Sequence, residues 1–319
     1  MERNVKLDNL KAFLIFTVVL GHSFEFLCVA EGVYSTLRAV IYSFHMPTFV
    51  FISGYLSKHS RKPLSHITVM YLSTYVFINT VYGLTPWRAT SPFNLLFPQF
   101  VYWYLLSLWF WRVLTPAISK VKFIIPASIL LTLYIGFFTD ADRFMALSKT
   151  ICFFPFFLAG YSFSMSFVAR MNKRILWIAL GVCFTLTIYA NIRSIIPVKM
   201  YDFIQSYSLT NVGNLDGVVM RLFMMTISFI MIVCLLGIIP NNRLKITMLG
   251  QNSLIIYLFH LFIIRIVSAF LPVPLEQNCL NIGVCIGLSV IICLVLGVKS
   301  ITRIYNKAIS KLIEILLRE

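Results

Sequence analysis

Two ionisable side chains, Lys11 and His22, share one face of a long apolar segment near the start of the chain. Eleven helical steps of about 100° make three turns plus about 20°, which separates the two residues by roughly 16 Å along the axis. Asp8 and Glu25 fall on the same face. Charge in hydrocarbon costs ~2.5–3.5 kcal/mol per residue, so this pattern predicts a functional face. A lysine that reaches the membrane surface and a histidine bonded to a neighbouring helix are the plainer alternatives.

Two further histidines are predicted at a similar depth, if their segments are helical. His45 lies thirteen residues before the basic turn at Lys58, roughly 20 Å above it. His260 lies fifteen residues after Lys245, roughly 22 Å above it. The sequence therefore favours a polar chamber shared with His22, although a buried histidine can also serve packing alone.

A buried imidazole stays neutral and accepts a proton, which suits a general base acting on a hydroxyl and is worth ~10²–10⁴ in rate. Glu25, one turn beyond His22, either orients that imidazole or is a charge at the outer rim. The imidazole can also carry an acyl group itself. Lys11, Lys58 and Arg61 are candidates for holding an anionic, phosphate-bearing cosubstrate. Determining membrane topology is the alternative role of the basic turn.

These side chains must be positioned by membrane helices, because 59% of the residues are hydrophobic and only 12% are charged. The prediction is an all-α polytopic protein, with both termini cytoplasmic and an amphipathic helix over 300–319 on the cytoplasmic surface. Ten apolar runs approach the ~20 residues that a crossing needs. They are 10–30, 36–57, 65–83, 99–115, 121–138, 148–168, 175–191, 216–239, 249–271 and 279–298.

The net charge of +16 reflects topology rather than a nucleic-acid partner. With ten crossings and an inner N-terminus, most of the 27 Lys and Arg residues fall on the inner side, as the positive-inside rule requires. The seven cysteines form no CxxC pair and no metal-binding spacing with histidine, so we predict no metal. Membrane lipids are the expected surroundings. The longest linker, 192–215, is predicted to face outward, where its polar side chains either meet a substrate or form a plain loop.

Several segments resemble the acyltransferase-3 family of integral-membrane acyltransferases. The DNLK opening and the FHMP and SGY elements are most similar to the fucose 4-O-acetylase-like branch. The matching segments are LDNLKAFLIFTVVLGHS (7–23), FHMPTFVFISGYLSK (44–58), YWYLLSLWFWR (102–112), FFPFFLAGY (153–161) and NSLIIYLFH (252–260).

The resemblance implies one membrane domain over residues 1–319 in a bacterial inner membrane. It implies transfer of an acyl group, usually acetyl from acetyl-CoA, to a hydroxyl of a surface polysaccharide or lipid-linked saccharide. His22 matches the family's essential histidine and Lys11 its donor-binding basic position, where many members have arginine. A lysine keeps the charge but loses the bidentate fork.

The working hypothesis built on this resemblance gives the remaining polar residues supporting roles. His45 or His260 polarises the thioester carbonyl or positions the acceptor. Trp103, Arg143 and Arg221, with the outward loop, contact the saccharide, although an interfacial aromatic belt also accounts for Trp103.

A transporter of a sugar-linked lipid or a small organic acid is the competing hypothesis. Intramembrane histidines and arginines and the helix-breaking Pro47 suit a transporter. Against it, the two halves show no internal repeat and no paired broken helices.

Overall fold

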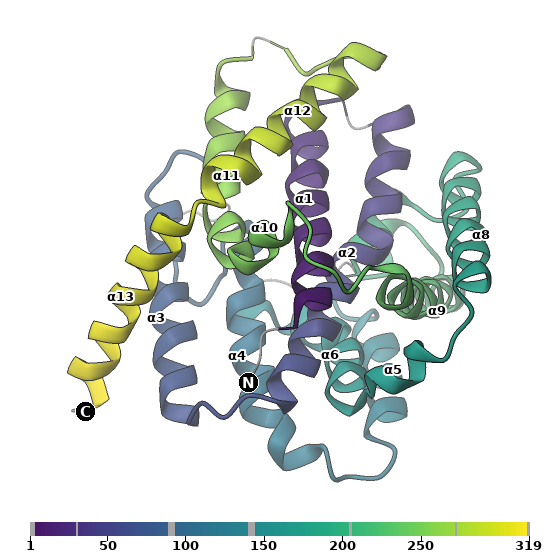
Figure 1. The fold of residues 1–319 in the computed structure, drawn as a ribbon. Coiled ribbons are helices and arrows are strands. Elements are labelled where there is room, and N and C mark those ends of the chain that lie inside the picture. Colours follow the sequence, from purple (N-terminus) through teal and green to yellow (C-terminus); the bar gives the residue numbers. More distant parts are fainter. Residues whose placement is uncertain are drawn as a thin grey trace. The chain divides into compact units, whose positions relative to one another are not determined.

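The computed structural model describes residues 4–29, 31–88, 93–139, 144–203, 206–271 and 273–317 (Figure 1). All regular elements within these ranges are helices. The longer ones are α1 (Val5–Leu27), α2 (Gly32–Lys58), α3 (Leu64–Gly83), α4 (Trp103–Ile118), α5 (Ile124–Ile135), α6 (Leu147–Ser162), α8 (Lys173–Ile192), α9 (Asn214–Ile238), α11 (Ser253–Ala269), α12 (Cys279–Leu296) and α13 (Lys299–Leu317). The short ones are η1 (Phe100–Tyr102), η3 (Phe144–Ala146), α7 (Met165–Ala169), η4 (Val198–Asp202), η5 (Ser208–Thr210) and α10 (Thr247–Gln251).

Each of the ten predicted apolar runs contains a helix, and the all-α prediction is confirmed for the described residues. In the part of the chain that the structure describes, six helices are long and apolar enough to cross a membrane, namely α1, α2, α8, α9, α12 and the segment Phe144–Ser162. Helices α5 and α11 are apolar but shorter. The chain is thus a multi-pass membrane protein, whereas the count of ten crossings and the sides of the termini stay predictions.

One predicted run, 249–271, is divided into α10 and α11 at Asn252. The Asn252 side chain donates a hydrogen bond to the carbonyl oxygen of Gly297 at 2.7 Å. An asparagine whose amide is engaged outside its own helix does not favour a continuous helix. Helix α13 forms where the amphipathic segment 300–319 was predicted, and none of its described residues is buried. Its place at a membrane surface stays a prediction.

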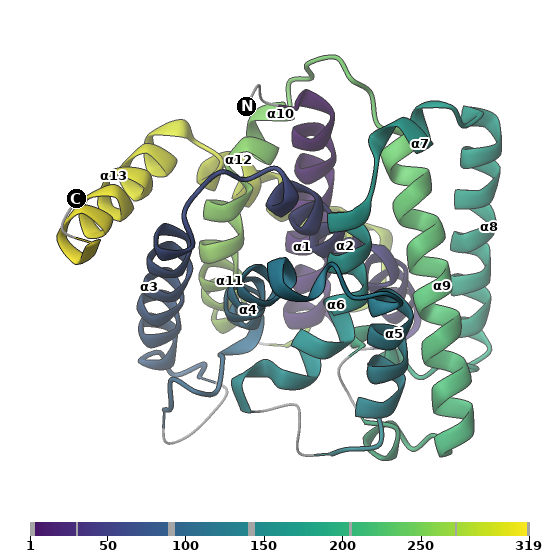
Figure 2. The ribbon, with the colours of Figure 1, turned by 90° about the horizontal axis from the view of Figure 1, so that it is seen from below.

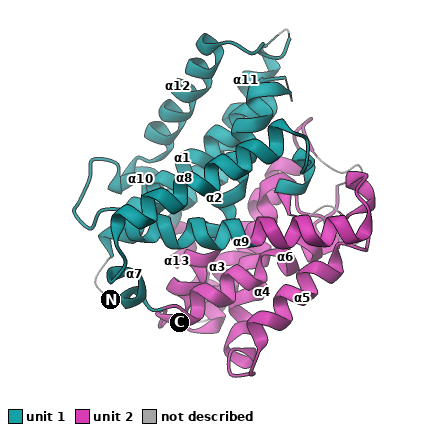
Figure 3. Ribbon diagram, turned by 90° about the vertical axis from the view of Figure 1, so that its right-hand side faces the viewer, with its two compact units in different colours: residues 1–49, 164–201, 226–305 teal, residues 50–163, 202–225, 306–319 magenta. Residues whose placement is uncertain are grey.

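The helices group into two compact units, each discontinuous in sequence (Figure 3). Unit 1 comprises residues 1–49, 164–201 and 226–305, and unit 2 comprises 50–163, 202–225 and 306–319. Helices α2, α9 and α13 contribute residues to both units, so a single domain over residues 1–319 stays a prediction.

Helix α1 is the central element of unit 1 and packs against α10, α11 and α12 (Figure 1). Of its most apolar window 61% is buried, against 28% for α12. Helix α12 instead exposes large apolar side chains such as Leu280 and Ile291, which suits contact with lipid.

Small and polar residues fix how the neighbours of α1 approach it. A Cβ added to Gly250 in α10 would collide with the α1 backbone at Asp8 and Ala12, so only glycine permits this approach. The hydroxyl oxygens of Ser23 in α1 and Ser289 in α12 lie 3.2 Å apart. In the same unit, Gly237 of α9 lies against the Leu176 side chain of α8, and Figure 2 shows these two helices side by side.

Pro47 lies inside α2, two residues after His45. A proline removes the hydrogen bond to the carbonyl four residues earlier, here that of Ser43. The hydroxyl of Ser228 in α9 donates to this carbonyl at 2.5 Å. A neighbouring hydroxyl thus satisfies the backbone group that the proline frees, as apolar surroundings require.

The same arrangement recurs inside unit 2, where Pro155 interrupts α6. The carbonyl of Ile151, four residues before it, accepts a hydrogen bond from the hydroxyl of Thr132 in α5 at 3.1 Å. Within this unit α5 packs on α6, and α4 packs on both α3 and α6.

Two glycines allow α6 to cross the unit 2 part of α2 at close range. A Cβ on Gly54 would collide with the backbone of Phe157, and one on Gly160 would collide with the backbone of Phe51. Next to this crossing, the hydroxyl oxygens of Ser53 and Tyr104 lie 2.6 Å apart. The SGY element, the FFLAGY element and the YWY element are therefore packed together.

Candidate active site

Five side chains of unit 1 form what we call the histidine cluster: His22 and Glu25 from α1, Tyr42 and His45 from α2, and His260 from α11. The centroids of the His22 and His260 rings lie 5.4 Å apart, and those of Tyr42 and His45 lie 4.8 Å apart. The structure therefore brings the three histidines near one another, whereas their shared depth in a membrane and the polar chamber stay predictions.

The His22 ring is held by a carboxylate. His22 Nδ1 lies 2.8 Å from Glu25 Oε2, and the Tyr42 hydroxyl donates to the same oxygen at 2.9 Å. Because an ionised carboxylate only accepts, the shared hydrogen lies on Nδ1 of His22, and in the neutral form of the ring Nε2 carries the lone pair. This arrangement leaves Nε2 as the proton-accepting atom.

Gly21 makes room for this arrangement. A Cβ at this position would approach Ile41 and the Tyr42 ring, each to 3.2 Å, which is tighter than ordinary contact. The absence of a side chain next to His22 lets the Tyr42 ring stand edge-on to the imidazole, with centroids 6.2 Å apart and an interplanar angle of 81°.

His260 is fully buried, and its Nδ1 lies 3.0 Å and 2.8 Å from the carbonyl oxygens of Ile256 and Tyr257. A carbonyl only accepts, so Nδ1 carries the hydrogen and Nε2 is an acceptor. Among the described residues, no group lies within hydrogen-bonding distance of this buried Nε2. An unpaired buried polar atom in a native fold calls for a reason, and a bound substrate would supply one.

His45 is also buried, and its Nδ1 donates to the carbonyl of Ile41 at 2.8 Å. The buried His45 ring differs in this respect from the His22–Glu25 pair, because the side chains of His22 and Glu25 remain 14% and 28% exposed. His22 is therefore the most exposed histidine of the cluster, whereas His45 and His260 are buried inside the unit.

Lys11, the predicted donor-binding residue, forms an ion pair with Asp8 at 2.8 Å, and its side chain is 18% exposed. Asp8 is buried, and Gln251 of α10 donates to its other oxygen at 3.3 Å. The carboxylate orients the lysine, and the partial exposure keeps the ammonium group open to a ligand. Lys11 and His22 lie on one uninterrupted helix.

The other predicted donor-binding residues belong to unit 2. Lys58 ends α2 and Arg61 lies in the turn that follows, and both are exposed. Their predicted role in holding phosphate stays a prediction.

Two of the predicted substrate-binding residues are packed inside unit 2. Trp103 is buried and stacks on Phe153 with ring centroids 5.2 Å apart. Arg221 is buried, donates to the carbonyl of Thr132 at 3.0 Å, and lies over the Tyr207 ring. These contacts stabilise the fold, and the predicted saccharide contacts stay predictions. Arg143 lies outside the described residues.

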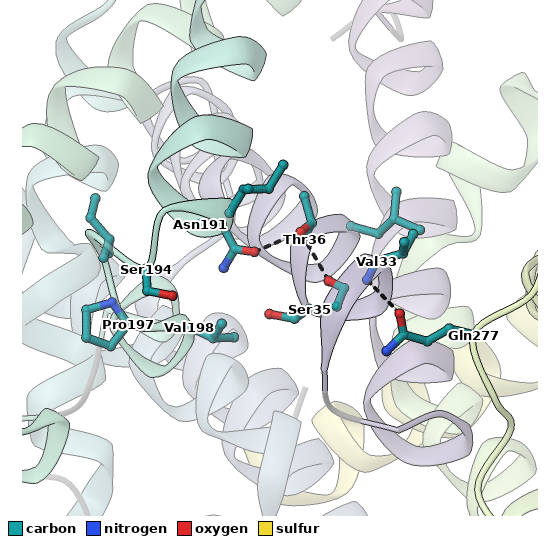
Figure 4. Close-up of a pocket in the computed structure, with 12 residues that line it drawn as sticks. Val33, Ser35, Thr36, Asn191, Ser194, Pro197, Val198 and Gln277 are labelled. Atoms are coloured by element: carbon teal, nitrogen blue, oxygen red, sulfur yellow. Dashed lines mark hydrogen bonds between the residues drawn. The ribbon is translucent and has the colours of Figure 1, made fainter.

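A pocket of about 570 Å³, lined by both apolar and polar side chains, opens in unit 1 (Figure 4). The start of α2, the end of α8 with the loop after it, and Gln277 line it. The Thr36 hydroxyl donates to the Asn191 side chain at 2.8 Å, and the amide of Val33 donates to the Gln277 side chain at 3.2 Å. These hydroxyl and amide groups can hydrogen-bond a ligand, while the apolar part of the lining can pack against it. The lining includes Ser194 from the loop that was predicted to meet substrate.

Sequence reasoning missed Tyr42, which contacts both members of the His22–Glu25 pair. The signal was its position three residues before His45, which places both side chains on one face of a helix. Within the described ranges, no group of three or more His, Cys, Asp or Glu side chains is placed to hold a metal ion.

The structure thus describes a multi-pass helical membrane protein with a carboxylate-bound histidine on its first helix. The comparison with protein families gives this class a name. The model described as an acyltransferase domain matches residues 4–298, and the chain belongs to the acyltransferase-3 family. Neither the curated proteins nor the solved structures gave a match.

Proposed function

We propose that this protein is a membrane O-acyltransferase that transfers an acyl group, most simply acetyl from acetyl-CoA, to a hydroxyl of a saccharide. Membership of the acyltransferase-3 family supports the reaction class. The hydrogen bond of 2.8 Å between His22 and Glu25 is the observation that carries the proposal. It resembles the base-and-carboxylate pair that activates a hydroxyl in other acyl-transfer enzymes.

In the proposed reaction His22 Nε2 removes the proton from the acceptor hydroxyl. The resulting oxygen attacks the thioester carbonyl, the carbon–sulfur bond breaks, and the imidazolium returns the proton to the leaving CoA thiolate. The Glu25 carboxylate stabilises the imidazolium formed in between. His45 and His260 remain the candidates for polarising the carbonyl or positioning the acceptor.

A second order of events uses the same atoms. His22 Nε2 attacks the thioester first, the carbon–sulfur bond breaks, and CoA leaves as a thiolate. The saccharide hydroxyl then attacks the acyl group, the bond to Nε2 breaks, and the proton of the hydroxyl neutralises the CoA thiolate. The two orders differ in one observable, because only the second produces an acylated enzyme when no acceptor is present.

For the donor, we propose that Lys11 contacts a phosphate group of acyl-CoA. The orientation of its ammonium group by Asp8 supports this role. Lys58 and Arg61 are proposed as further phosphate contacts. This assignment requires the N-terminal end of α1 to face the cytoplasm of a bacterial cell, with the chain in its inner membrane.

For the acceptor, we propose a surface-polysaccharide or lipid-linked saccharide. The pocket lined by Thr36, Asn191 and Gln277 supports a polar ligand rich in hydroxyl groups. Trp103, Arg143 and Arg221 stay candidates for contacts with this ligand. A closer relationship to the fucose 4-O-acetylase-like branch is part of the same proposal.

The test is acyl transfer by the purified protein in detergent, with radiolabelled acetyl-CoA and glycan extracted from a strain that lacks the gene. The wild type is expected to release free CoA and to label the glycan, and His22→Ala is expected to do neither. His66→Ala, in α3, is the matched control and is expected to retain transfer. Vesicles that take up a sugar-linked lipid or organic acid without forming CoA would instead support a transporter.

A further inference from the structure

Two cysteines of unit 1, far apart in the sequence, contact each other where α1 packs against α12. Cys28 is the residue that ends α1, and Cys285 lies in the second turn of α12. Their sulfur atoms are 3.5 Å apart, and both residues are free thiols in this structure. Neither residue belongs to the histidine cluster, and the proposed acyl transfer uses neither of them.

Contacts on both sides of the sulfur pair fix the two backbones relative to each other. The N–H of Leu275, in the segment before α12, donates to the carbonyl of Leu27 at 2.7 Å, and the N–H of Val29 donates back to the carbonyl of Leu275 at 3.2 Å. Toward the start of α1, the hydroxyl oxygens of Ser23 and Ser289 lie 3.2 Å apart. The two sulfurs therefore lie between a backbone bridge and a hydroxyl contact.

The separation of the sulfurs is close to what a disulfide needs. A disulfide bond is about 2.05 Å long, so the two sulfurs must approach each other by about 1.5 Å. Rotation about the Cα–Cβ bonds moves the sulfurs while the backbones stay in place. Cys28 is 7% exposed and Cys285 is 0% exposed, so an oxidant in solution meets Cys28 first. A single buried cysteine would act only as a small apolar group, whereas two sulfurs in contact can form a bond.

The predicted topology places this pair on the side where disulfides persist. Cys28 follows the last turn of α1, and Cys285 lies near the start of α12. The distribution of basic residues predicts that these ends of the two helices face outward. Disulfides form and persist outside the bacterial inner membrane, whereas the cytoplasm keeps thiols reduced.

We propose that Cys28 and Cys285 form a reversible disulfide that links the end of α1 to α12. The Cys28 thiolate attacks one sulfur of an external disulfide, and the other external sulfur leaves as a thiolate. The Cys285 thiolate then attacks the Cys28 sulfur, and the remaining external sulfur leaves. The protein loses two electrons and two protons, which the two released thiols carry. The inference goes beyond the proposed acyl transfer and does not depend on it.

The test is a map of the cysteines in the folded wild-type protein in detergent. One sample is incubated with oxidised glutathione and one with reduced glutathione. Both are quenched with acid, alkylated under denaturing conditions and digested without reduction for mass spectrometry. The oxidised sample is expected to contain a peptide that joins Cys28 to Cys285, with alkylation of both thiols at least about tenfold lower. Cys293, buried further along α12, is expected to be alkylated equally in both samples.

Thermal unfolding in detergent provides a second measurement. The oxidised wild type is expected to unfold about 5 °C or more above the reduced one, because the bond joins segments 257 residues apart in sequence. Cys28→Ala and Cys285→Ala are each expected to abolish both the joined peptide and this difference. Cys293→Ala is the matched control and is expected to retain both.

A glutathione adduct on Cys28 without the joined peptide would overturn the inference, as would equal alkylation of the pair in the two samples. A joined peptide whose formation lowers the unfolding midpoint would also overturn it, because the folded protein would then not accommodate the bond. The peptide map uses the wild type alone, so an unstable variant does not affect that result.

Discussion

His22 and Glu25 lie one turn apart on α1, with Nδ1 of the imidazole 2.8 Å from the carboxylate oxygen. The spacing of three residues on one helix brings the two groups together without help from a loop. The contact fixes which ring nitrogen is protonated, and Tyr42 fixes the carboxylate from a second helix. The orientation of the proposed base therefore depends on the packing of α1 against α2.

Replacing Glu25 by glutamine is expected to lower the rate of acyl transfer roughly 10–100-fold, as removal of groups that orient a functional histidine commonly does. The amide keeps the size of the side chain but cannot stabilise an imidazolium. Initial rates of CoA release check this, and an unchanged thermal midpoint shows that the fold is intact. If the Glu25→Gln variant kept the wild-type rate, Glu25 would be only a charge at the outer rim and would not orient His22.

Tyr42→Phe is expected to have a smaller effect, a loss of about three- to tenfold in rate. It removes one neutral donor from the Glu25 carboxylate, worth ~0.5–1.5 kcal/mol, and leaves the ring in place. In a double variant with Glu25→Gln the losses should be less than additive, because the hydroxyl acts through the carboxylate. Fully additive losses would show that Tyr42 acts on the substrate instead.

Lys11→Met is expected to raise the KM for acetyl-CoA about tenfold with little change in kcat, because the lost contact is remote from the reacting atoms. The variant also leaves Asp8 buried without its cation, which destabilises the fold. Asp8→Asn combined with Lys11→Met removes both charges and provides the control. Lys11→Arg should keep the wild-type KM within a few fold. A normal KM in the double variant would remove Lys11 from the donor site.

Gly250→Ala is expected to destabilise the protein by ~1–3 kcal/mol, the usual cost of overpacking, because the new methyl group meets the backbone of α1. Gly283→Ala, in α12, is the matched control. A Cβ there has no heavy atom within 4 Å among the described residues, so alanine should be neutral or stabilising. Thermal unfolding of the two variants in detergent makes the comparison, and equal midpoints would contradict the close approach of α10 to α1.

Ser228→Ala is expected to cost ~1–3 kcal/mol, because it leaves the Ser43 carbonyl buried without its donor. Pro47→Ala in the same chain restores a backbone N–H four residues after Ser43, so the double variant should regain stability. Recovery in the double variant is the sign that the hydroxyl compensates for the proline. Without recovery, the serine contributes through packing only.

The sequence allowed the helices to be predicted because long apolar runs leave few alternatives in a membrane. It did not predict the break at Asn252, because the competing partner, Gly297, is supplied by a segment 45 residues away. Helical rise predicted only a similar depth for His22 and His260, and the packing of α11 on α1 is what brings their rings together. Tyr42 was missed because 15% of the residues in this chain are aromatic. The sequence alone does not distinguish a tyrosine that contacts Glu25 from one that only packs against its neighbours.

Trp103 and Arg221 illustrate a second limit of sequence reasoning, although their predicted contacts with a saccharide stay predictions. Both have side chains that suit a saccharide, yet the structure uses them to pack against Phe153 and Tyr207 inside unit 2. Large side chains with a polar group serve packing and binding equally well, and only their surroundings separate the two uses.

Helix α1 is continuous from Lys11 to His22. If a phosphate of acyl-CoA binds at Lys11 and its thioester at His22, the helix fixes a distance of about 16 Å between these two parts of the donor. A donor with a shorter distance between its phosphate and its thioester would bind without reacting. The enzyme would then select its acyl donor by this distance as well as by charge.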